Sequence, residues 1–176
     1  HVVDTVLCLG QQVARHQHCT AVGGERSHQV AHPAHPDRIE AVTYMLAASI
    51  TKGDITLKNA KLEHLMAVVD KLTEAGLEIK KEPNGFRARY EHRLKPIDVT
   101  TLSFPGFPTD MQAQVMSLMA VTDGISVITE KIYPDRFIHI SELGRMGADI
   151  ILEGPSAIVK GVKHLSGAPV MASDLR

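Results

Sequence analysis

Cysteine is scarce in this sequence: only Cys8 and Cys19 occur among 176 residues. Two cysteines are too few for the disulfide framework of a small secreted domain, so we expect a reducing compartment, the cytoplasm. Charge of one sign is also lacking, because the formal net charge is −1 and the sequence pI is about 6.9. Without a basic stripe, nothing favours nucleic acid or an anionic membrane surface as a partner.

Long apolar runs are missing as well. No run reaches the roughly 18 residues that suggest a membrane-spanning helix, and the N-terminus does not resemble a signal peptide. With 44% hydrophobic and 22% charged residues, the composition is typical of a globular protein. The chain begins at His1 rather than at methionine, and from this we expect a piece of a longer protein.

The expected secondary structure repeats along the chain. A first unit begins at Asp37 with an amphipathic helix, continues with a strand, and then has a second amphipathic helix that ends at Gly76. Their apolar positions at helical spacing are Ile39, Val42, Leu46 and Ile50, then Leu62, Leu65, Val69 and Leu72. Short apolar runs predict strands at 54–58, 77–80, 86–90 and 97–100, with a turn at 83–85. We expect the run at 97–100 to close this unit.

A second unit has the same order of expected elements. It begins at Thr109 with a helix whose buried face consists of Met111, Val115, Leu118 and Met119. A strand at 125–129, a short helix around 140–146 and strands at 148–152, 157–160 and 168–171 follow. Each unit begins with an aspartate at a helix start, and Asp174 would open a third unit.

Segment 104–114 carries an acid at a helix start. Pro105 and Pro108 restrict the approach loop, and Thr109 with Gln112 three residues later predicts a capping box. Asp110 then lies in the first turn, off the apolar face. An acid there complements the helix dipole, worth about 0.3–1 kcal/mol, and it suits a ligand equally well, so the residues alone leave both interpretations open.

Segment 104–114, followed in order by segments 129–148 and 165–176, resembles the enolpyruvyl transferases, in particular those that act on UDP-N-acetylglucosamine. The resemblance covers Asp37 to Arg176 and, more weakly, Val2 to Gly10. It implies an α/β fold of repeated helix-strand units, an inside-out barrel with helices inside and sheets outside. Residues 36–176 would hold two of the three units of one domain, so the barrel is incomplete. Residues 1–35 would be the C-terminal remnant of the second domain.

The resemblance implies transfer of enolpyruvate from phosphoenolpyruvate to the 3-hydroxyl of UDP-N-acetylglucosamine, the first committed step of peptidoglycan synthesis. That chemistry needs a base at the hydroxyl and an acid at the methylene carbon. It implies no cofactor, no metal, no nucleic acid and no membrane. The partners would be the two substrates and the remainder of the transferase chain. Most groups that grip phosphoenolpyruvate in this family fall outside this sequence, so we expect the chain to be inactive alone.

Five site residues follow from the resemblance, position by position. Asp110 matches the aspartate that binds and deprotonates the acceptor hydroxyl. Ile132 falls where the family presents a backbone group to the sugar nucleotide, and Tyr133 follows in the same loop. Asp174 and Arg176 match an active-site pair, in which the rigid fork of arginine donors suits a phosphate or carboxylate.

Two further charged residues, Asp135 and Arg136, flank a turn in the second motif. An exposed ion pair, worth about 0–1 kcal/mol, explains them as well as a substrate contact does. We therefore assign them no role.

Residues 11–36 depart from the family pattern, which has a glycine-rich turn and two apolar strands here. We expect a divergent, loosely ordered polar segment; a disturbed reading frame in the gene would produce the same change. Imidazole and thiolate groups suit zinc, but their spacing matches no structural zinc signature, so we predict no metal site. The side chains concerned are His16, His18, Cys19, His28 and His32.

Two alternative functions stay open. The shikimate-pathway enolpyruvyl transferase shares the fold, although the sequence of 109–114 argues against it. A non-catalytic module that binds a sugar nucleotide or a partner protein belongs to a different class. Binding of UDP-N-acetylglucosamine without turnover, lost on Asp110→Ala, would favour that module.

Overall fold

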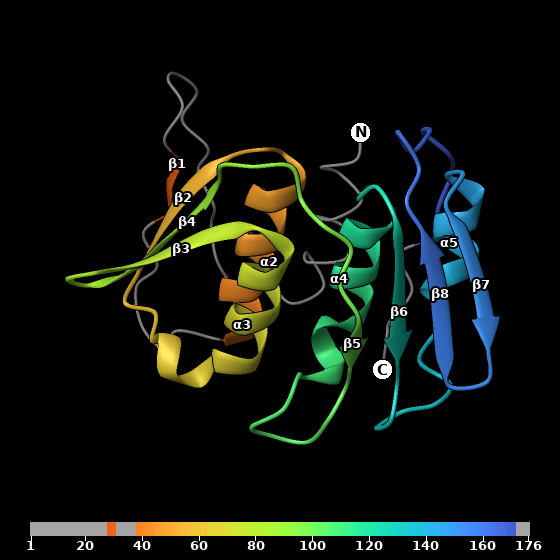
Figure 1. Cartoon of the computed structure of the whole chain (residues 1–176), viewed down its shortest axis with the longest axis horizontal. Coiled ribbons are helices and arrows are strands. Elements are labelled where there is room, and N and C mark those ends of the chain that lie inside the picture. Colours follow the sequence, from red (N-terminus) through yellow and green to blue (C-terminus); the bar gives the residue numbers. More distant parts are fainter. Residues whose placement is uncertain (1–27, 31–37, 172–176) are drawn as a thin grey trace.

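The computed structural model describes residues 28–30 and 38–171, which form two four-stranded sheets with helices between them (Figure 1). The first sheet contains, in spatial order, β1 (His28–Val30), β2 (Asp54–Lys58), β4 (Gly85–Tyr90) and β3 (Leu77–Glu82). The second contains β5 (Val99–Thr100), β6 (Ile125–Thr129), β8 (Ser156–Lys160) and β7 (Asp149–Glu153). In each sheet the first pair is parallel and the other two pairs are antiparallel. The two sheets therefore have the same topology.

Two helices, α2 (Arg38–Ile50) and α4 (Gln112–Met119), lie between the sheets. Helix α2 contacts β2 and β4, α4 contacts β6 and β8, and the helices contact each other. The 3₁₀ turn η2 (Thr109–Met111) leads into α4. The first turn of α2 lines one pocket together with η2, which directly precedes α4. The C-terminal ends of α2 and α4 line a second pocket. The two helices therefore run parallel.

The remaining helices pack against the hairpins. The 3₁₀ turn η1 (Leu62–His64) precedes α3 (Met66–Ala75), which contacts β3, and α5 (His139–Arg145) contacts β7. Helix α3 ends at Gly76, whose φ of 104° is the left-handed conformation that glycine adopts without steric cost. The sequence pattern predicted this end correctly.

Helix α4 is buried on every side: all eight of its residues are buried. A helix that touches solvent on one face alternates apolar and polar residues, whereas one enclosed by neighbours is largely apolar all round. The predicted buried face, formed by Met111, Val115, Leu118 and Met119, is confirmed. The other face is buried too, because α2 covers what a surface helix would expose.

Three expectations about strands were wrong. The run at 97–100 contains β5, which does not close the first sheet but pairs in parallel with β6 of the second. Residues 168–171 are not a strand. Strand β1 lies inside the segment 11–36 that we expected to be loosely ordered, and it pairs with β2 of the first sheet. The rest of that segment lies outside the described residues.

Among the helices of the described residues, none is both long and apolar enough to span a membrane.

Candidate functional site

Three of the five predicted site residues lie within the described structure, on two neighbouring segments. Asp110 belongs to η2, and Ile132 and Tyr133 belong to the turn that follows β6. Asp174 and Arg176 lie outside the described residues. The η2 segment and the turn at 130–136 meet through side chains to which the sequence analysis assigned no role in the site.

Glu130 connects these segments. It directly follows β6 and is completely buried. Its Oε1 atom accepts hydrogen bonds from the Thr101 hydroxyl at 2.5 Å and from the backbone N–H groups of Ile132 and Tyr133 at 2.8 and 3.0 Å. Its Oε2 atom accepts one from the Thr109 hydroxyl at 2.8 Å. One carboxylate thus fixes both the turn and the start of η2.

Glu130 is ionised despite its burial. Desolvation alone would raise the pKa of this carboxyl, but hydrogen bonds from Thr101, from the backbone of Tyr133 and Ile132, and from Thr109 outweigh it. The pKa of Glu130 is therefore held below its usual value. A fixed negative charge lies beneath the site.

Arg136 links the turn to the predicted base. Its Nη2 donates to Oδ1 of Asp110 at 2.7 Å, and its Nη1 donates to the Thr109 hydroxyl at 3.1 Å. The guanidinium carbon lies 5.7 Å from the centre of the Tyr133 ring. The side chain of Arg136 is 11% exposed and that of Asp110 46% exposed. The exposed-ion-pair interpretation of Asp135 and Arg136 was therefore wrong, because Arg136 is largely buried and forms an ion pair with Asp110.

The predicted capping box is absent. In the described part of the chain no side chain caps η2 or α4, and the Thr109 hydroxyl donates to Glu130 instead. The Gln112 side chain is buried, and neither its amide nitrogen nor its oxygen is hydrogen-bonded to any residue that the structure describes. The Thr109 hydroxyl is held by tertiary contacts to Glu130 and Arg136 instead of turning back onto its own helix.

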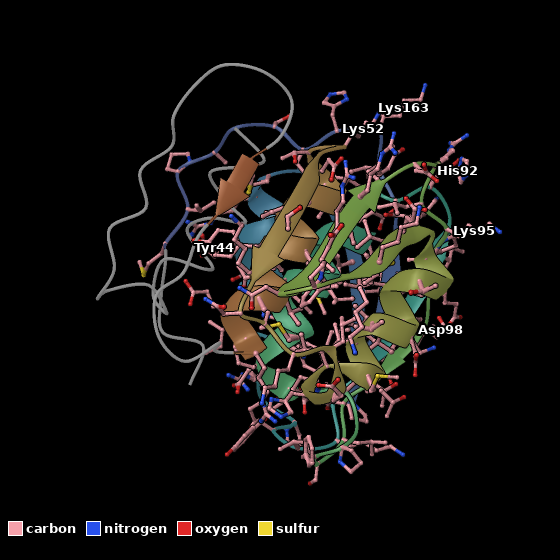
Figure 2. All side chains as sticks on the ribbon, turned by 90° about the vertical axis from the view of Figure 1, so that its left-hand side faces the viewer. Tyr44, Lys52, His92, Lys95, Asp98 and Lys163 are labelled. Atoms are coloured by element: carbon pink, nitrogen blue, oxygen red, sulfur yellow. The ribbon has the colours of Figure 1, made fainter. Side chains whose placement is uncertain are left out.

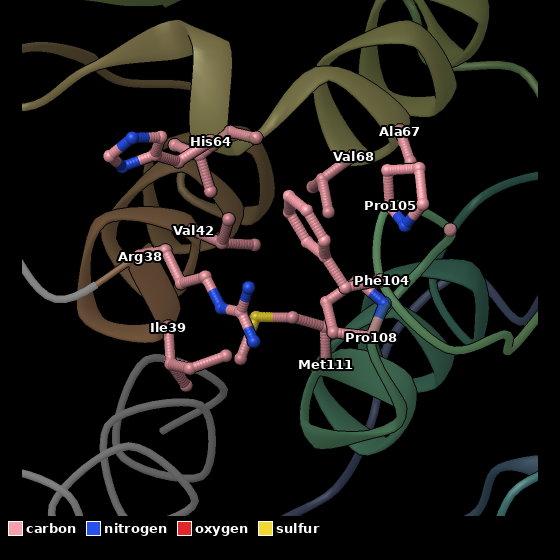
Figure 3. Close-up of a pocket in the computed structure, with 12 residues that line it drawn as sticks. Arg38, Ile39, Val42, His64, Ala67, Val68, Phe104, Pro105, Pro108 and Met111 are labelled. Atoms are coloured by element: carbon pink, nitrogen blue, oxygen red, sulfur yellow. The ribbon is translucent and has the colours of Figure 1, made fainter.

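The predicted outward placement of Asp110 is confirmed by its exposure. The neighbouring residues Pro108 and Met111 line a small pocket together with the first turns of α2 and α3 (Figure 3). The Arg38 guanidinium extends into it, 5.5 Å from the centre of the Phe104 ring. The N-terminal ends of both central helices, which favour anions, therefore lie at the end of the molecule that carries Asp110.

The opposite end has a second hollow of about 350 Å³, between the C-terminal ends of α2 and α4. Lys52 and Lys163 lie together at its rim, at one edge of the view in Figure 2. Arg93, another lining residue, is ion-paired with Asp123, which also lines the hollow. The Lys52 and Lys163 ammonium groups give this hollow a positive rim, far along the helices from Asp110.

Metal-ligating side chains do not gather in groups of three or more within 28–30 and 38–171. The histidines and cysteine considered for zinc lie outside these residues, except His28, whose backbone forms β1.

Sequence reasoning missed Thr101 and Glu130, and it considered Arg136 but assigned it no role. Thr101 and Glu130 directly follow the parallel strands β5 and β6, whose register pairs Thr100 with Thr129. The carboxyl ends of parallel strands meet at one sheet edge, where functional side chains often gather in α/β sheets. A glutamate directly after an apolar strand was a usable signal, but its partner strand was assigned to the wrong sheet.

Comparison with known proteins decides the family. A family model described as EPSP synthase (3-phosphoshikimate 1-carboxyvinyltransferase) matches residues 2–176. The chain belongs to the EPSP synthase family. Solved enolpyruvyl transferases of this fold are similar to it: NikO from Streptomyces tendae superposes with a TM-score of 0.65 at 23% identity, over 72% of this chain and 30% of that one.

Sequence relatives in the EPSP synthase family are closer. The UDP-N-acetylglucosamine 1-carboxyvinyltransferase of Geobacter metallireducens is 57% identical over 155 residues, 88% of this chain and 37% of that protein. The enzyme of the same name from Myxococcus xanthus is 55% identical over 147 residues, 84% of this chain and 35% of that protein. The chain thus spans little more than a third of the length of these relatives.

Proposed function

We propose that this chain is the acceptor-side part of a UDP-N-acetylglucosamine enolpyruvyl transferase, with Asp110 as the base at the sugar 3-hydroxyl. The observation that carries the proposal is the Asp110 carboxylate, half exposed at the start of a central helix and held from behind by Arg136. The 57% identity to a relative with that activity supports the choice of acceptor.

In the proposed reaction the 3-hydroxyl oxygen attacks the central carbon of phosphoenolpyruvate while Asp110 accepts the hydroxyl proton. An acid elsewhere protonates the methylene carbon. Loss of a proton from the new methyl group then expels phosphate and restores the double bond. Asp110 suits the first step because a carboxylate within hydrogen-bond reach of a hydroxyl both orients it and removes its proton.

The turn at 131–133 is the second proposed contact. The Ile132 and Tyr133 N–H groups are bound to Glu130, so a sugar nucleotide would meet the Ile132 carbonyl rather than its N–H. Tyr133, 60% exposed, would flank it. Asp174 and Arg176 stay proposed contacts from the resemblance alone.

The chain spans 37% of the Geobacter metallireducens relative. The proposal therefore places the phosphoenolpyruvate groups and the acid on the remainder of a transferase. Within the family's fold, residues 36–176 would be two of three units of an inside-out barrel, and the active site would lie between two such domains.

A hybrid transferase tests the proposal. In it, the aligned 155 residues of this chain replace the corresponding part of the Geobacter metallireducens enzyme. We expect phosphate release from phosphoenolpyruvate that requires UDP-N-acetylglucosamine, and a fall of roughly 100-fold or more in kcat on Asp110→Asn. Asp70→Asn, an exposed carboxylate on α3, is the matched control.

Two other outcomes would favour the alternatives. The family model carries the name of the shikimate-pathway enzyme, and release that requires shikimate 3-phosphate would favour that activity. A hybrid that binds UDP-N-acetylglucosamine without turnover, with binding lost on Asp110→Ala, would favour a non-catalytic binding module.

A further inference from the structure

We propose that Glu130, Thr109 and Arg136 form a positioning chain that aims the Asp110 carboxylate at its substrate. The inference rests on the proposed function and adds to it the residues that orient the base. It follows from four consecutive hydrogen-bonding groups that run from the buried end of β6 to the surface of η2.

The direction of every hydrogen bond in the chain is determined. Arg136 has donors only, so the Thr109 oxygen must accept from Nη1 and the Asp110 Oδ1 must accept from Nη2. Glu130, ionised, only accepts, so the Thr109 hydroxyl proton must point to its Oε2. Thr109 is the one member that both donates and accepts, and it joins the buried carboxylate to the guanidinium.

The buried end of the positioning chain is held rigidly. Glu130 is completely buried, and its other oxygen is held by Thr101 and two backbone N–H groups. The guanidinium is planar, so one bond to Thr109 and one to Asp110 fix its orientation. Tyr133 lies 5.7 Å from the guanidinium carbon and limits its motion on one side.

Asp110, at the exposed end of the positioning chain, has a carboxylate oxygen available for a substrate. Among the described residues, the Asp110 side chain is hydrogen-bonded through Oδ1, to Arg136. Its Oδ2 is the atom left for a substrate hydroxyl, and the carboxyl group is 46% exposed. Arg136 fixes the rotation of the carboxylate, which sets where Oδ2 points. Orientation of this kind changes the rate of a reaction more than the affinity for substrate.

Thr109→Val tests the chain because valine keeps the shape of threonine and removes the hydroxyl. In the hybrid transferase we expect a fall in kcat of roughly 10- to 100-fold and a KM for UDP-N-acetylglucosamine that changes by less than about threefold. Thr109→Ser restores the hydroxyl and should restore kcat. Thr73→Val, at an exposed position of α3, is the matched control and should leave kcat unchanged.

Glu130→Gln tests the direction of the hydrogen bonds. Glutamine can keep an acceptor for Thr101 and the two N–H groups, but its NH₂ group would face Thr109 and donate where Glu130 accepts. The Thr109 proton then loses its acceptor. We expect kcat to fall as in Thr109→Val, again with little change in KM.

Wild-type kcat in Thr109→Val, or failure of Thr109→Ser to restore it, would overturn the positioning chain. If the unsubstituted hybrid shows no acceptor-dependent turnover, the proposed function fails instead, and NMR of the 176-residue chain decides the inference. There the ¹³C resonance of the Asp110 carboxyl should move in Thr109→Val and return in Thr109→Ser. If this resonance does not move in Thr109→Val, the positioning chain is refuted.

Discussion

At the residue scale, two buried ionisable groups of this protein have different charge states. Glu130 stays charged because four donors surround it. His139 stays neutral: burial, and secondarily the Arg136 charge, lower its pKa from 6.5 to about 4. Its Nε2 lies 3.2 Å from the Met116 sulfur, and its Nδ1 has no hydrogen-bond partner within 28–30 and 38–171. A neutral imidazole is tolerated there, whereas an imidazolium is not.

The buried His139 makes stability depend on pH. Its pKa is about 4 in the folded state against 6.5 for an unburied histidine, so between these values the unfolded chain binds the extra proton. The free energy of unfolding should therefore fall as pH drops from 6.5 to 4, by up to about 3 kcal/mol. Glu130, with a lowered pKa, adds a loss of stability only below about pH 4.5.

Urea unfolding at several pH values measures this effect. His139→Met should remove the decline between pH 6.5 and 4, while His164→Gln, at an exposed position, should retain it. An identical pH dependence in wild type and His139→Met would contradict the lowered pKa.

Replacing glycine by alanine should change the free energy of unfolding in opposite directions at two positions. A Cβ at Gly161 would lie 1.7 Å from the Thr122 carbonyl oxygen, a backbone atom that cannot move aside. Gly161→Ala should therefore lower the free energy of unfolding by roughly 3 kcal/mol or more. At Gly144, in α5, a Cβ would meet no atom of the described residues within 4 Å, and Gly144→Ala should raise the free energy of unfolding by roughly 0.5–1 kcal/mol.

Thermal or urea unfolding distinguishes the two glycines. Gly167→Ala, where a Cβ also meets nothing within 4 Å in the part of the chain that the structure describes, controls for the loss of glycine itself. Equal stability of the Gly161→Ala and Gly167→Ala variants would show that the close approach to Thr122 is not present in solution.

At the scale of elements, the two hairpins differ in their edge strands. The hairpin pairs Glu82 with Gly85 in the first unit and Glu153 with Ser156 in the second. Ile151 and Leu152 therefore occupy the places of Lys80 and Lys81. They are 56% and 49% exposed. Charged residues, especially lysine, protect an edge strand from pairing with other chains, and β7 lacks this protection.

We therefore expect Ile151→Lys to reduce self-association of the chain, as measured by light scattering over a range of concentrations. The free energy of unfolding should change by less than about 0.5 kcal/mol because the position is exposed. Lys80→Ile on β3 is the reverse substitution and should increase association. Unchanged scattering in both variants would show that the β7 edge is covered in solution.

Elements differed in how well the sequence predicted them. The spacing of Val42 and Leu46 predicted α2, and Gly76 predicted the end of α3, because periodicity and glycine act locally. Strands β1 and β5 are three and two residues long and exist through parallel pairing with β2 and β6. Such pairing joins residues far apart in the sequence, so local patterns could not assign it.

The candidate site was likewise predictable in part. Asp110 could be placed because the proline-rich loop and the helix start are local features, and the resemblance supplied its role. Glu130 and Arg136 could not be placed from the sequence, because their role depends on hydrogen bonds to Thr109, which lies on a different segment. A sequence does not distinguish a buried carboxylate from an exposed one, because burial depends on how the folded chain packs.

At the scale of the whole molecule, two units of the same topology pack through parallel helices. This arrangement places η2 and the first turns of α2 and α3 at one end, beside a small pocket. Asp110, Arg136 and the turn after β6 lie on the second unit alone. In the proposed function, one unit therefore supplies the acceptor side of the active site, and the phosphoenolpyruvate side comes from another part of a transferase.

A crystal structure of the hybrid transferase with UDP-N-acetylglucosamine bound would test this assignment most directly. We predict a carboxylate oxygen of Asp110 at about 2.6–3.2 Å from the sugar 3-hydroxyl, with Arg136 still bound to the other oxygen. A sugar whose 3-hydroxyl contacts neither Asp110 nor the turn at 131–133, or a nucleotide bound elsewhere, would contradict it.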